Sequence, residues 1–318
     1  MILITGVAGF IGFHLSQHYL RAGKTVIGID NINSYYDPTL KQKRLDILSA
    51  HESFLFHKID MCEYEKLEKV FTQHTPSKVC HLAAQAGVRY SLTHPFAYQK
   101  SNNEGFLNII ELARHNKVEN FVYASSSSVY GANTKLPFAE TDPVNNPISL
   151  YAATKRSNEL VAHCYSHLYG LNCSGLRFFT VYGPWGRPDM ALFLFTKAII
   201  EGKPIDVYNN GKMKRNFTYI DDIVNGIVKV LDAPKAYELY NIGNSRAEEL
   251  LDFITQIEKC AGKKAILNFL PMQPGDVPAT MADIEKIRSL GFEPSTNIDK
   301  GIANFVQWYR EYYDKALA

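Results

Sequence analysis

The sequence begins with the run Met1-Ile2-Leu3-Ile4-Thr5-Gly6-Val7-Ala8-Gly9-Phe10-Ile11-Gly12, in which an apolar strand leads into three glycines at intervals of three residues. Phe13–Ala22 follows with the apolar spacing that is typical of a helix. Gly6 permits a tight turn, Gly9 lets the backbone approach a pyrophosphate, and Gly12 lets the helix pack closely on the strand. A strand, a glycine turn and a helix in this order predict a dinucleotide-binding site.

The next strand, Thr25–Ile29, ends at an acidic residue. Asp30 lies 18 residues after Gly12, close to the interval of about 20 residues at which a carboxylate accepts hydrogen bonds from the adenosine ribose. An acid in this place repels a 2′-phosphate, so the sequence predicts NAD rather than NADP as the cofactor. The alternative is an aspartate that only caps the following loop.

Three further apolar strands alternate with helical segments, and each ends at polar residues: Phe54–Ile59 at Asp60, Val79–Ala84 at Gln85, and Phe121–Ala124 at serines 125–128. This alternation predicts an α/β fold with a Rossmann-type, doubly wound parallel sheet. Ligands of such sheets bind at the carboxyl ends of the strands. The glycine turn, Asp30 and the ends of these three strands therefore predict one shared site at that edge.

A tyrosine and a lysine four residues apart, Tyr151 and Lys155, follow the serines. On a helix this spacing places both side chains on one face. An ammonium group beside a phenol is expected to lower the pKa of the phenol from about 10 toward the working pH. Ser126, 25 residues before Tyr151, supplies a hydroxyl for the same site. A Tyr-x-x-x-Lys pair alone is a weak signal, and its weight comes from the dinucleotide motif before it.

After Tyr182 the sheet pattern weakens, and a smaller mixed α/β lobe is expected to bind the substrate. The expected division assigns residues 1–181 plus about 218–244 to the NAD-binding domain, and residues 182–217 plus 245–318 to the substrate-binding lobe. Helices are expected at 96–116, 149–169, 191–202, 217–231, 247–262 and 298–313, and strands at 205–208 and 239–243. The aromatic residues of the last helix are expected to pack in the core.

The composition excludes several classes of protein. The 318 residues include 34 lysines and arginines against 32 acidic residues, so no nucleic-acid surface is expected. No apolar run reaches the ~20 residues of a membrane helix, and no signal peptide is expected, because a strand begins at residue 2. Five scattered cysteines predict free thiols and a cytoplasmic location. No spacing of histidines, cysteines or acids predicts a metal site.

Together these features resemble the extended short-chain dehydrogenase/reductase family. The shared motifs are the glycine turn, Asp30, Asp60, His81–Ala84, the serine cluster and the pair Tyr151 and Lys155, and they extend over essentially the whole chain. Within this family the sequence most resembles the UDP-glucuronate 4-epimerases, through the stretches 30–37, 85–91, 182–190 and 271–277. Asn216 departs from the pattern, since relatives usually have Asp after the arginine.

The resemblance implies roles for individual residues, and the catalytic ones are Tyr151, Lys155 and Ser126. The residues expected to hold NAD are Gly6, Gly9, Phe10, Ile11, Gly12, Asp30, Asn31, Asp60, Met61, Leu82, Ala83, Ala84, Gln85, Asn102, Tyr151 and Lys155. Those expected to contact a UDP-sugar are Arg89, Ser127, Ser128, Thr180, Arg187, Tyr208, Arg215 and Asp276. Arg215 also suits pyrophosphate on chemical grounds, because a guanidinium binds two phosphate oxygens at once. Tyr208 is expected either to stack on uracil or to be an ordinary strand aromatic.

The resemblance also implies a reaction, the conversion of UDP-glucuronate to UDP-galacturonate. Tyr151, as a phenolate, would take the proton of the sugar 4-hydroxyl while a hydride leaves C4 for NAD. The transient 4-keto sugar would then rotate and be reduced on its other face. A 4-keto uronic acid readily loses carbon dioxide, so the carboxylate must be held out of line with the carbonyl. Hydroxyls such as those of Ser127, Ser128 and Thr180 are expected to hold it.

Other activities of the same fold are the alternatives. A UDP-glucose or UDP-N-acetylglucosamine 4-epimerase differs in its sugar, and a UDP-glucuronate decarboxylase releases carbon dioxide. A decarboxylase usually has Glu after the catalytic hydroxyl, and a 4,6-dehydratase has an Asp-Glu pair there, whereas this chain has serines. A catalytically inactive NAD sensor would typically lack the tyrosine or the lysine. Relatives usually form homodimers through two helices per subunit, which correspond here to 96–116 and 149–169.

Overall fold

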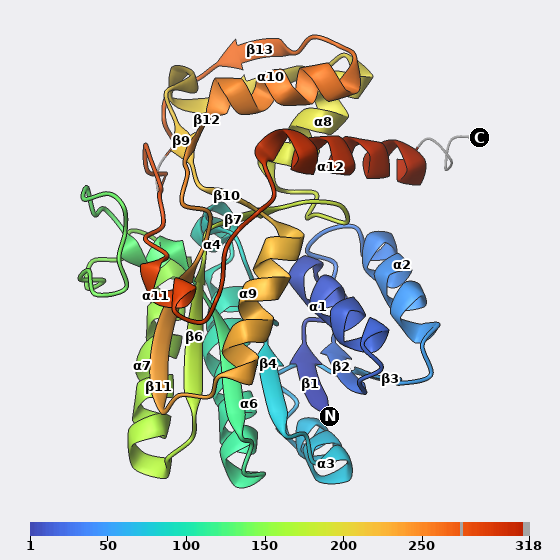
Figure 1. The fold of residues 1–318 in the computed structure, drawn as a ribbon, viewed down its shortest axis with the longest axis vertical. Coiled ribbons are helices and arrows are strands. Elements are labelled where there is room, and N and C mark those ends of the chain that lie inside the picture. Colours follow the sequence, from blue (N-terminus) through green and yellow to red (C-terminus); the bar gives the residue numbers. More distant parts are fainter. Residues whose placement is uncertain (274–275, 314–318) are drawn as a thin grey trace.

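The computed structural model describes residues 1–273 and 276–313, and a seven-stranded parallel sheet forms its centre (Figure 1). The strand order is β11-β6-β5-β4-β1-β2-β3. The strands are β1 (Ile2–Thr5), β2 (Val26–Asp30), β3 (Phe54–Lys58), β4 (Lys78–His81), β5 (Asn120–Ser126), β6 (Cys173–Phe178) and β11 (Tyr237–Ile242). The prediction of an α/β, Rossmann-type fold is confirmed.

Helices cover both faces of this sheet. One face packs against α1 (Phe10–Arg21), α2 (Pro38–Ser49) and α9 (Ile220–Asp232), and the other against α3 (Tyr64–His74), α6 (Gly105–His115) and α7 (Leu150–Tyr169). Each face has its own apolar cluster of buried side chains. Because central strands are buried on both sides, they appear in the sequence as continuous apolar runs rather than as an alternation of apolar and polar residues.

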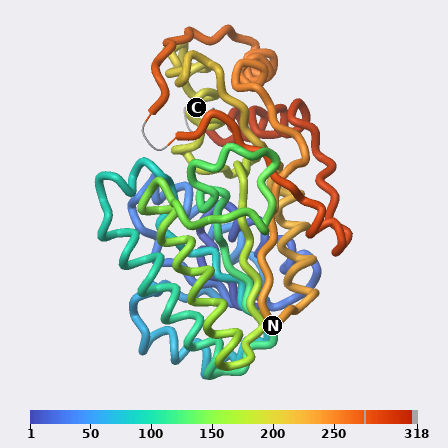
Figure 2. The backbone as a smooth tube through the Cα atoms, turned by 90° about the vertical axis from the view of Figure 1, so that its left-hand side faces the viewer, coloured from blue at the N-terminus to red at the C-terminus, as the bar shows by residue number. Residues whose placement is uncertain are grey.

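A second region lies over the carboxyl ends of the sheet strands, and it is formed mainly by the yellow to red part of the chain (Figures 1 and 2). Its helices are α8 (Ala191–Glu201), α10 (Leu250–Ala261), α11 (Glu285–Arg288) and α12 (Ile298–Tyr313). Three pairs of short strands join them: β7 (Thr180–Tyr182) with β10 (Phe217–Tyr219), β8 (Pro204–Val207) with β13 (Ile266–Phe269), and β9 (Lys214–Arg215) with β12 (Glu248–Glu249). The division of the chain into two domains stays a prediction.

Three of the expected helices differ in geometry or by more than one residue in their start. The helix expected at 247–262 starts only at Leu250, because Glu248–Glu249 forms β12 and pairs with β9. The helix expected at 217–231 starts only at Ile220, because Phe217–Tyr219 forms β10 and pairs with β7, which is distant in the sequence. The helix expected at 96–116 consists of α5 (Pro95–Tyr98), a π-helical turn at Gln99–Glu104 and α6. The last helix, α12, lies at 298–313 as predicted, and its Trp308 and Tyr309 are buried.

No helix in residues 1–273 and 276–313 combines the length and the apolar character that crossing a membrane requires.

Candidate functional site

A cavity of about 1170 Å³ lies between the carboxyl ends of the sheet strands and the second region. This volume exceeds the roughly 300–1,000 Å³ of most small-molecule pockets, so it has room for two extended ligands. With one exception, Asn102, every site residue predicted from the sequence lines it. From the NAD set these are Gly6, Gly9, Phe10, Ile11, Gly12, Asp30, Asn31, Asp60, Met61, Leu82, Ala83, Ala84, Gln85, Tyr151 and Lys155, and from the others Ser126, Ser127, Ser128, Arg89, Thr180, Arg187, Tyr208, Arg215 and Asp276.

The glycine turn between β1 and α1 is packed against the end of β4. Gly6 has a φ of 75°, and a Cβ atom there would lie 2.9 Å from the amide nitrogen of Ala83. The Thr5 hydroxyl oxygen accepts hydrogen bonds from the N–H groups of Leu82 at 3.1 Å and Ala83 at 3.0 Å, which holds the two segments together. A Cβ on Gly12 would lie 2.8 Å from the Gly6 carbonyl carbon. The close backbone approach at this turn therefore requires glycine.

Acidic residues at the ends of β2 and β3 form one rim of the cavity. The Asp30 carboxylate accepts the N–H of Ala8 at 3.0 Å on one oxygen and that of Ile32 at 2.8 Å on the other. Burial raises the pKa of Asp30. Asn31 donates to Asp60 at 2.8 Å, which links the ends of the two strands. Fixed acceptors beside a glycine turn fit the ribose end of a dinucleotide.

Asn102 lies behind the cavity wall, so the expectation that it contacts the cofactor is corrected here. It is 1% exposed and belongs to the π-helical turn. Its Oδ1 accepts the N–H of Gln85 at 2.8 Å, and its Nδ2 donates to the carbonyl of Gln85 and to Thr154 Oγ1, both at 3.0 Å. Asn102 thus fixes the backbone of a cavity residue and does not itself reach the cavity.

Helix α7 presents Tyr151 and Lys155 to the cavity from its first two turns. The Ser149 hydroxyl caps the helix by accepting the N–H of Ala152 at 3.1 Å. The ammonium of Lys155 is buried and donates to the carbonyl of Ala124, at the end of β5, at 3.0 Å. Burial lowers the pKa of Lys155 to about 8.

The electrostatic surroundings of Tyr151 differ from the expectation. Burial raises the pKa of its phenol, whereas a hydrogen bond with Ser126 and the positive charge of Arg187 act in the opposite direction. The prediction that Lys155 lowers the pKa of Tyr151 is wrong. Desolvation of the phenol is the largest effect on this pKa, and it raises it. The protein cation that favours the phenolate is Arg187, which places its guanidinium near the reactive end of the cavity.

The serine cluster ends β5 and continues as a 3₁₀ turn, η2 (Ser127–Tyr130). The hydroxyl of Ser126 accepts the N–H of Ser128 at 3.2 Å and thereby caps this turn. Phe178 on β6 is the register partner of Ser126. Ser128 and Thr180 each lie two residues after one of these partners, and both line the cavity together with Ser126 and Ser127. Of these residues, Ser126 is the one that hydrogen-bonds Tyr151.

A second group of charges lies at the opposite, second-region side of the cavity. Arg89 pairs with Asp276 at 3.2 Å, and its guanidinium lies 5.0 Å from the ring centroid of Tyr208. Arg215 donates to two main-chain carbonyl groups at 3.0 and 3.3 Å. Burial lowers the pKa of Arg215, the Asp276 carboxylate opposes this shift, and the charge of Arg89 adds to it. The two positive charges of Arg89 and Arg215 exceed the single negative charge of Asp276. This excess of positive charge fits a doubly charged pyrophosphate.

Sequence reasoning missed several polar residues of the cavity, among them Tyr35, Asp189 and Lys41. Asp189 accepts two hydrogen bonds from Arg187, at 2.6 and 3.0 Å, and one from the Tyr35 hydroxyl at 3.0 Å. Lys41 donates to the carbonyl of Asn33 at 2.7 Å, and burial lowers its pKa to about 8. Tyr35 and Asp189 stand in stretches that carried the family resemblance, so that signal was available, whereas no sequence pattern pointed to Lys41.

Known proteins resemble this chain over nearly its whole length. The model of the NAD dependent epimerase/dehydratase family matches residues 2–243. Protein CapI of Staphylococcus aureus is 51% identical, with 99% of each chain covered. A probable UDP-glucuronate 4-epimerase of Rhizobium meliloti is 45% identical over 99% of this chain and 98% of its own.

Among solved structures, a UDP-glucuronic acid 4-epimerase from Bacillus cereus, in complex with UDP-glucuronic acid and NAD, superposes with a TM-score of 0.92. It is 36% identical, and the match covers 98% of this chain and 99% of the other. The family model covers well over half of the chain, and the glycine turn, Asp30 and the Tyr151–Lys155 pair lie within the matched part. The chain therefore belongs to the NAD dependent epimerase/dehydratase family.

Proposed function

We propose that this protein is an NAD-dependent UDP-glucuronate 4-epimerase, an isomerase that interconverts UDP-glucuronate and UDP-galacturonate. The main observation behind the proposal is that the Tyr151–Lys155 pair and a set of hydroxyl side chains line the same cavity. These hydroxyl-bearing residues are Ser127, Ser128 and Thr180, and the glycines of the turn line the cavity with them. The relatives named above that are described as UDP-glucuronate 4-epimerases support the same activity.

The residues present fit NAD as the resident cofactor. The turn around Gly6 admits no side chain, and Asp30 stands at its rim with both oxygens fixed by backbone N–H groups. Gln85 is 6% exposed, lines the cavity and has a buried amide nitrogen with no protein partner. When bound, NAD accepts the hydride from the sugar C4 and returns it to the opposite face.

The protein supplies the proton transfer. Tyr151 removes the proton of the sugar 4-hydroxyl and later returns it, and Ser126 hydrogen-bonds the phenol and so favours its charged form. Arg187 adds a positive charge nearby, and its own charge is balanced by Asp189. Lys155, fixed by the Ala124 carbonyl, presents its ammonium group to the nicotinamide ribose. Because the cofactor is regenerated in each cycle, the net reaction is an isomerisation.

The hydroxyls beside Tyr151 keep the 4-keto acid from decomposing. Ser127, Ser128 and Thr180 hydrogen-bond the C6 carboxylate and hold it out of line with the C4 carbonyl. A hydrogen bond to a charged group contributes about 1.5–3 kcal/mol, so two or three of them fix one rotamer. Tyr208, Arg89, Arg215 and Asp276 hold the UDP part at the other end of the cavity.

Measuring turnover of charged and neutral UDP-sugars side by side tests this function. Purified enzyme is incubated with UDP-glucuronate, UDP-galacturonate, UDP-glucose or UDP-N-acetylglucosamine, and the nucleotides are separated by anion-exchange chromatography. We expect both uronates to reach the same mixture with no release of carbon dioxide. If the neutral sugars turn over and UDP-glucuronate does not, the proposal and the role of the serines are wrong. Carbon dioxide released in step with turnover would instead identify a decarboxylase.

We also propose that the protein is a cytoplasmic homodimer joined through α6 and α7. All five cysteines are free, which suits a reducing compartment. Helices α6 and α7 pack side by side on one face of the sheet and expose large apolar side chains, including Leu107 at 48%, Leu160 at 53% and Leu168 at 65%. An exposed apolar patch of this kind marks an interaction site.

A charge in this surface should separate the subunits. We expect the native protein to sediment as a dimer and Leu160→Asp to sediment as a monomer in analytical ultracentrifugation, since an unpaired carboxylate would be buried in the interface. Leu251→Asp is the matched control, because Leu251 is 41% exposed on α10, in the second region. A native protein that is monomeric at micromolar concentration would exclude the dimer.

A further inference from the structure

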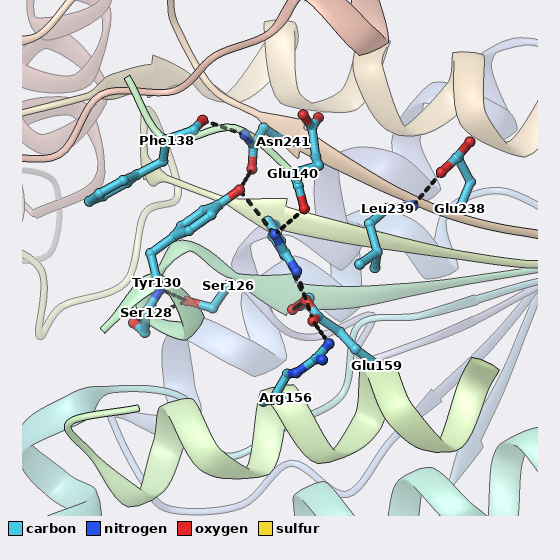
Figure 3. A network of polar contacts seen from close by, with 12 residues as sticks. Ser126, Ser128, Tyr130, Phe138, Glu140, Arg156, Glu159, Glu238, Leu239 and Asn241 are labelled. Atoms are coloured by element: carbon cyan, nitrogen blue, oxygen red, sulfur yellow. Dashed lines mark hydrogen bonds and ion pairs between the residues drawn. The ribbon is translucent and has the colours of Figure 1, made fainter. Parts of the chain in front are cut away.

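A buried ion pair joins the catalytic helix to the sheet. Glu159 on α7 is 0% exposed and Arg177 on β6 is 1% exposed. The guanidinium donates to both carboxylate oxygens, through Nε at 2.8 Å and through Nη2 at 3.0 Å. The Ser125 hydroxyl donates to the same carboxylate at 2.7 Å. Arg156, on the same helix as Glu159, also donates to it, at 2.9 Å (Figure 3). The Glu159 carboxylate is thus fully occupied by donors from two strands and its own helix.

This pair fixes the start of the serine segment relative to Tyr151. Glu159 lies one helical turn after Lys155 and two turns after Tyr151 on the same helix. Ser125 immediately precedes Ser126 and is the register partner of Arg177 on the neighbouring strand. Since Lys155 also donates to the carbonyl of the preceding strand residue, Ala124, helix α7 is bonded to two consecutive residues at the end of β5.

The same arginine fixes the other end of the serine segment. Arg177 Nη1 donates to the hydroxyl of Tyr130, the last residue of the 3₁₀ turn, at 3.1 Å. That hydroxyl donates to Asn241 Oδ1 at 2.6 Å, and the Asn241 amide donates to the carbonyl of Phe138 (Figure 3). The same amide also donates to the carbonyl of Asp283. The Tyr130 ring stacks on that of Phe138 at 4.6 Å between centroids. The hydroxyls of residues 126–128 therefore lie on a segment that one buried guanidinium holds at both ends.

We propose that Glu159, Arg177 and Tyr130 are positioning residues that set the placement of Ser126–Ser128 against Tyr151, and that they thereby decide whether the 4-keto acid is reduced or decarboxylated. This inference rests on the proposed function and deepens it. None of the three residues lines the cavity, so they act only through the serines and the helix. A fully satisfied buried network gives such a segment one well-defined position.

The chemistry makes the outcome sensitive to small displacements. Decarboxylation breaks the C5–C6 bond, whose electron pair passes into the C4 carbonyl to form an enolate, and water then returns a proton to C5. This requires the C5–C6 bond to lie parallel to the π orbitals of the carbonyl. If the serine segment shifts, the carboxylate can rotate into that alignment, and the proton transfer at Tyr151 also slows. A misplacement of about 1 Å in a catalytic arrangement can cost about 100-fold in rate.

Tyr130→Phe tests the inference with the least risk to folding. Removing Glu159 or Arg177 would leave its partner as an unpaired buried charge and would destabilise the protein. Tyr130→Phe keeps the ring stacked on Phe138 and removes only the hydroxyl that joins Arg177 to Asn241. Tyr219→Phe is the matched control, because Tyr219 is also buried and its hydroxyl accepts a hydrogen bond from an asparagine, Asn304, at 3.1 Å outside this network.

We expect Tyr130→Phe to lower kcat for UDP-glucuronate by about tenfold or more, the effect of losing the two hydrogen bonds that its hydroxyl makes with Arg177 and Asn241, with KM changed less than about twofold. Carbon dioxide should be released in a measurable fraction of turnovers, whereas the native enzyme and Tyr219→Phe should release none. Native kcat without carbon dioxide in Tyr130→Phe would overturn the inference. An equal loss of activity in Tyr130→Phe and Tyr219→Phe would also overturn the inference, because it would show a general loss of protein stability.

Hydrogen exchange of the NAD-loaded enzyme without sugar supplies a readout independent of turnover. We expect the amides of residues 126–130 to exchange faster in Tyr130→Phe than in the native enzyme, and those of α12 to exchange at the same rate. Unchanged exchange at 126–130 would show that the network does not hold the segment. If the native enzyme fails to convert UDP-glucuronate, the proposed function is wrong, and exchange at residues 126–130 alone then decides whether Tyr130 holds the segment.

Discussion

Tyr151→Phe should reduce turnover of UDP-glucuronate by about 10³-fold or more while the purified protein still contains NAD. A positioned general acid or base contributes about 10²–10⁴-fold, and Tyr151 is the phenol that the structure places at the glycine-turn side of the cavity. Phenylalanine keeps the ring and its edge contact with Tyr98, whose ring centroid lies 6.0 Å away. We therefore expect the substitution to slow the proton transfer and to leave NAD binding unchanged. Rates are measured by chromatography, and NAD is measured after acid release.

Tyr98→Phe is the control for this experiment. Tyr98 is buried next to Tyr151, but its hydroxyl donates to the carbonyl of Ala86 at 3.0 Å, and the residue does not line the cavity. The same hydroxyl also donates to the carbonyl of Gly87. We expect its removal to change turnover by about tenfold or less, because a shared hydrogen bond to the backbone is lost and the proton transfer is kept. If Tyr151→Phe keeps a tenth or more of the native rate, Tyr151 is not the base.

Gly12→Ala should abolish NAD binding. The added methyl would lie 2.8 Å from the Gly6 carbonyl carbon and closer still to its oxygen, so the glycine turn must move away from α1. The obstructing atoms are backbone, which cannot change rotamer, and we expect a loss in stability of about 3 kcal/mol or more, at the upper end for overpacking. The measurements are the NAD content of the purified protein, the affinity for added NAD by calorimetry, and the midpoint of thermal unfolding.

Gly262→Ala separates the steric effect from the loss of glycine itself. Gly262 ends α10 with a φ of 66°, and a Cβ there meets no atom within 4 Å. Alanine at such a C-terminal cap costs about 1 kcal/mol of stability through backbone strain alone. We expect this variant to melt slightly earlier and to bind NAD as the native protein does. Native-like NAD affinity in Gly12→Ala would contradict the assignment of the turn.

The sheet and the residues at its edge could be predicted because the signals are local. A buried parallel strand is a continuous apolar run, and the residue that follows it lies at the ligand edge, so Asp30 and the serines were placed without tertiary information. The strands of the second region were harder to predict from the sequence. Ile266–Phe269 lies in a mostly apolar stretch but is exposed along its whole length, so its apolar residues do not mark a buried strand, and its partner β8 is distant in the sequence.

The details of the site depend on contacts between distant segments. The amide of Asn102 turns to Gln85 because a π-helical turn brings it behind the wall, and no spacing rule describes that turn. The pKa of Tyr151 depends on how deeply the phenol is buried, which its neighbours in sequence do not reveal. Arg187 was assigned to the nucleotide by resemblance, and no sequence pattern indicated that its charge also acts on the pKa of Tyr151. Motifs therefore identified residues that line the cavity more reliably than the partners of those residues.

The position of β11 at the edge of the sheet has a consequence for synthesis of the chain. β11 pairs with β6, yet residues 179–236 are made between them, including much of the second region. At translation rates of ~5–20 residues per second, this delay is about 3–12 s. During that time β6 is an edge strand that pairs only with β5, and Tyr130 lacks Asn241. The sheet edge that supports the serine segment is therefore completed only after much of the second region has been made, and residues 243–318, which include Asp276 of the cavity, are made last.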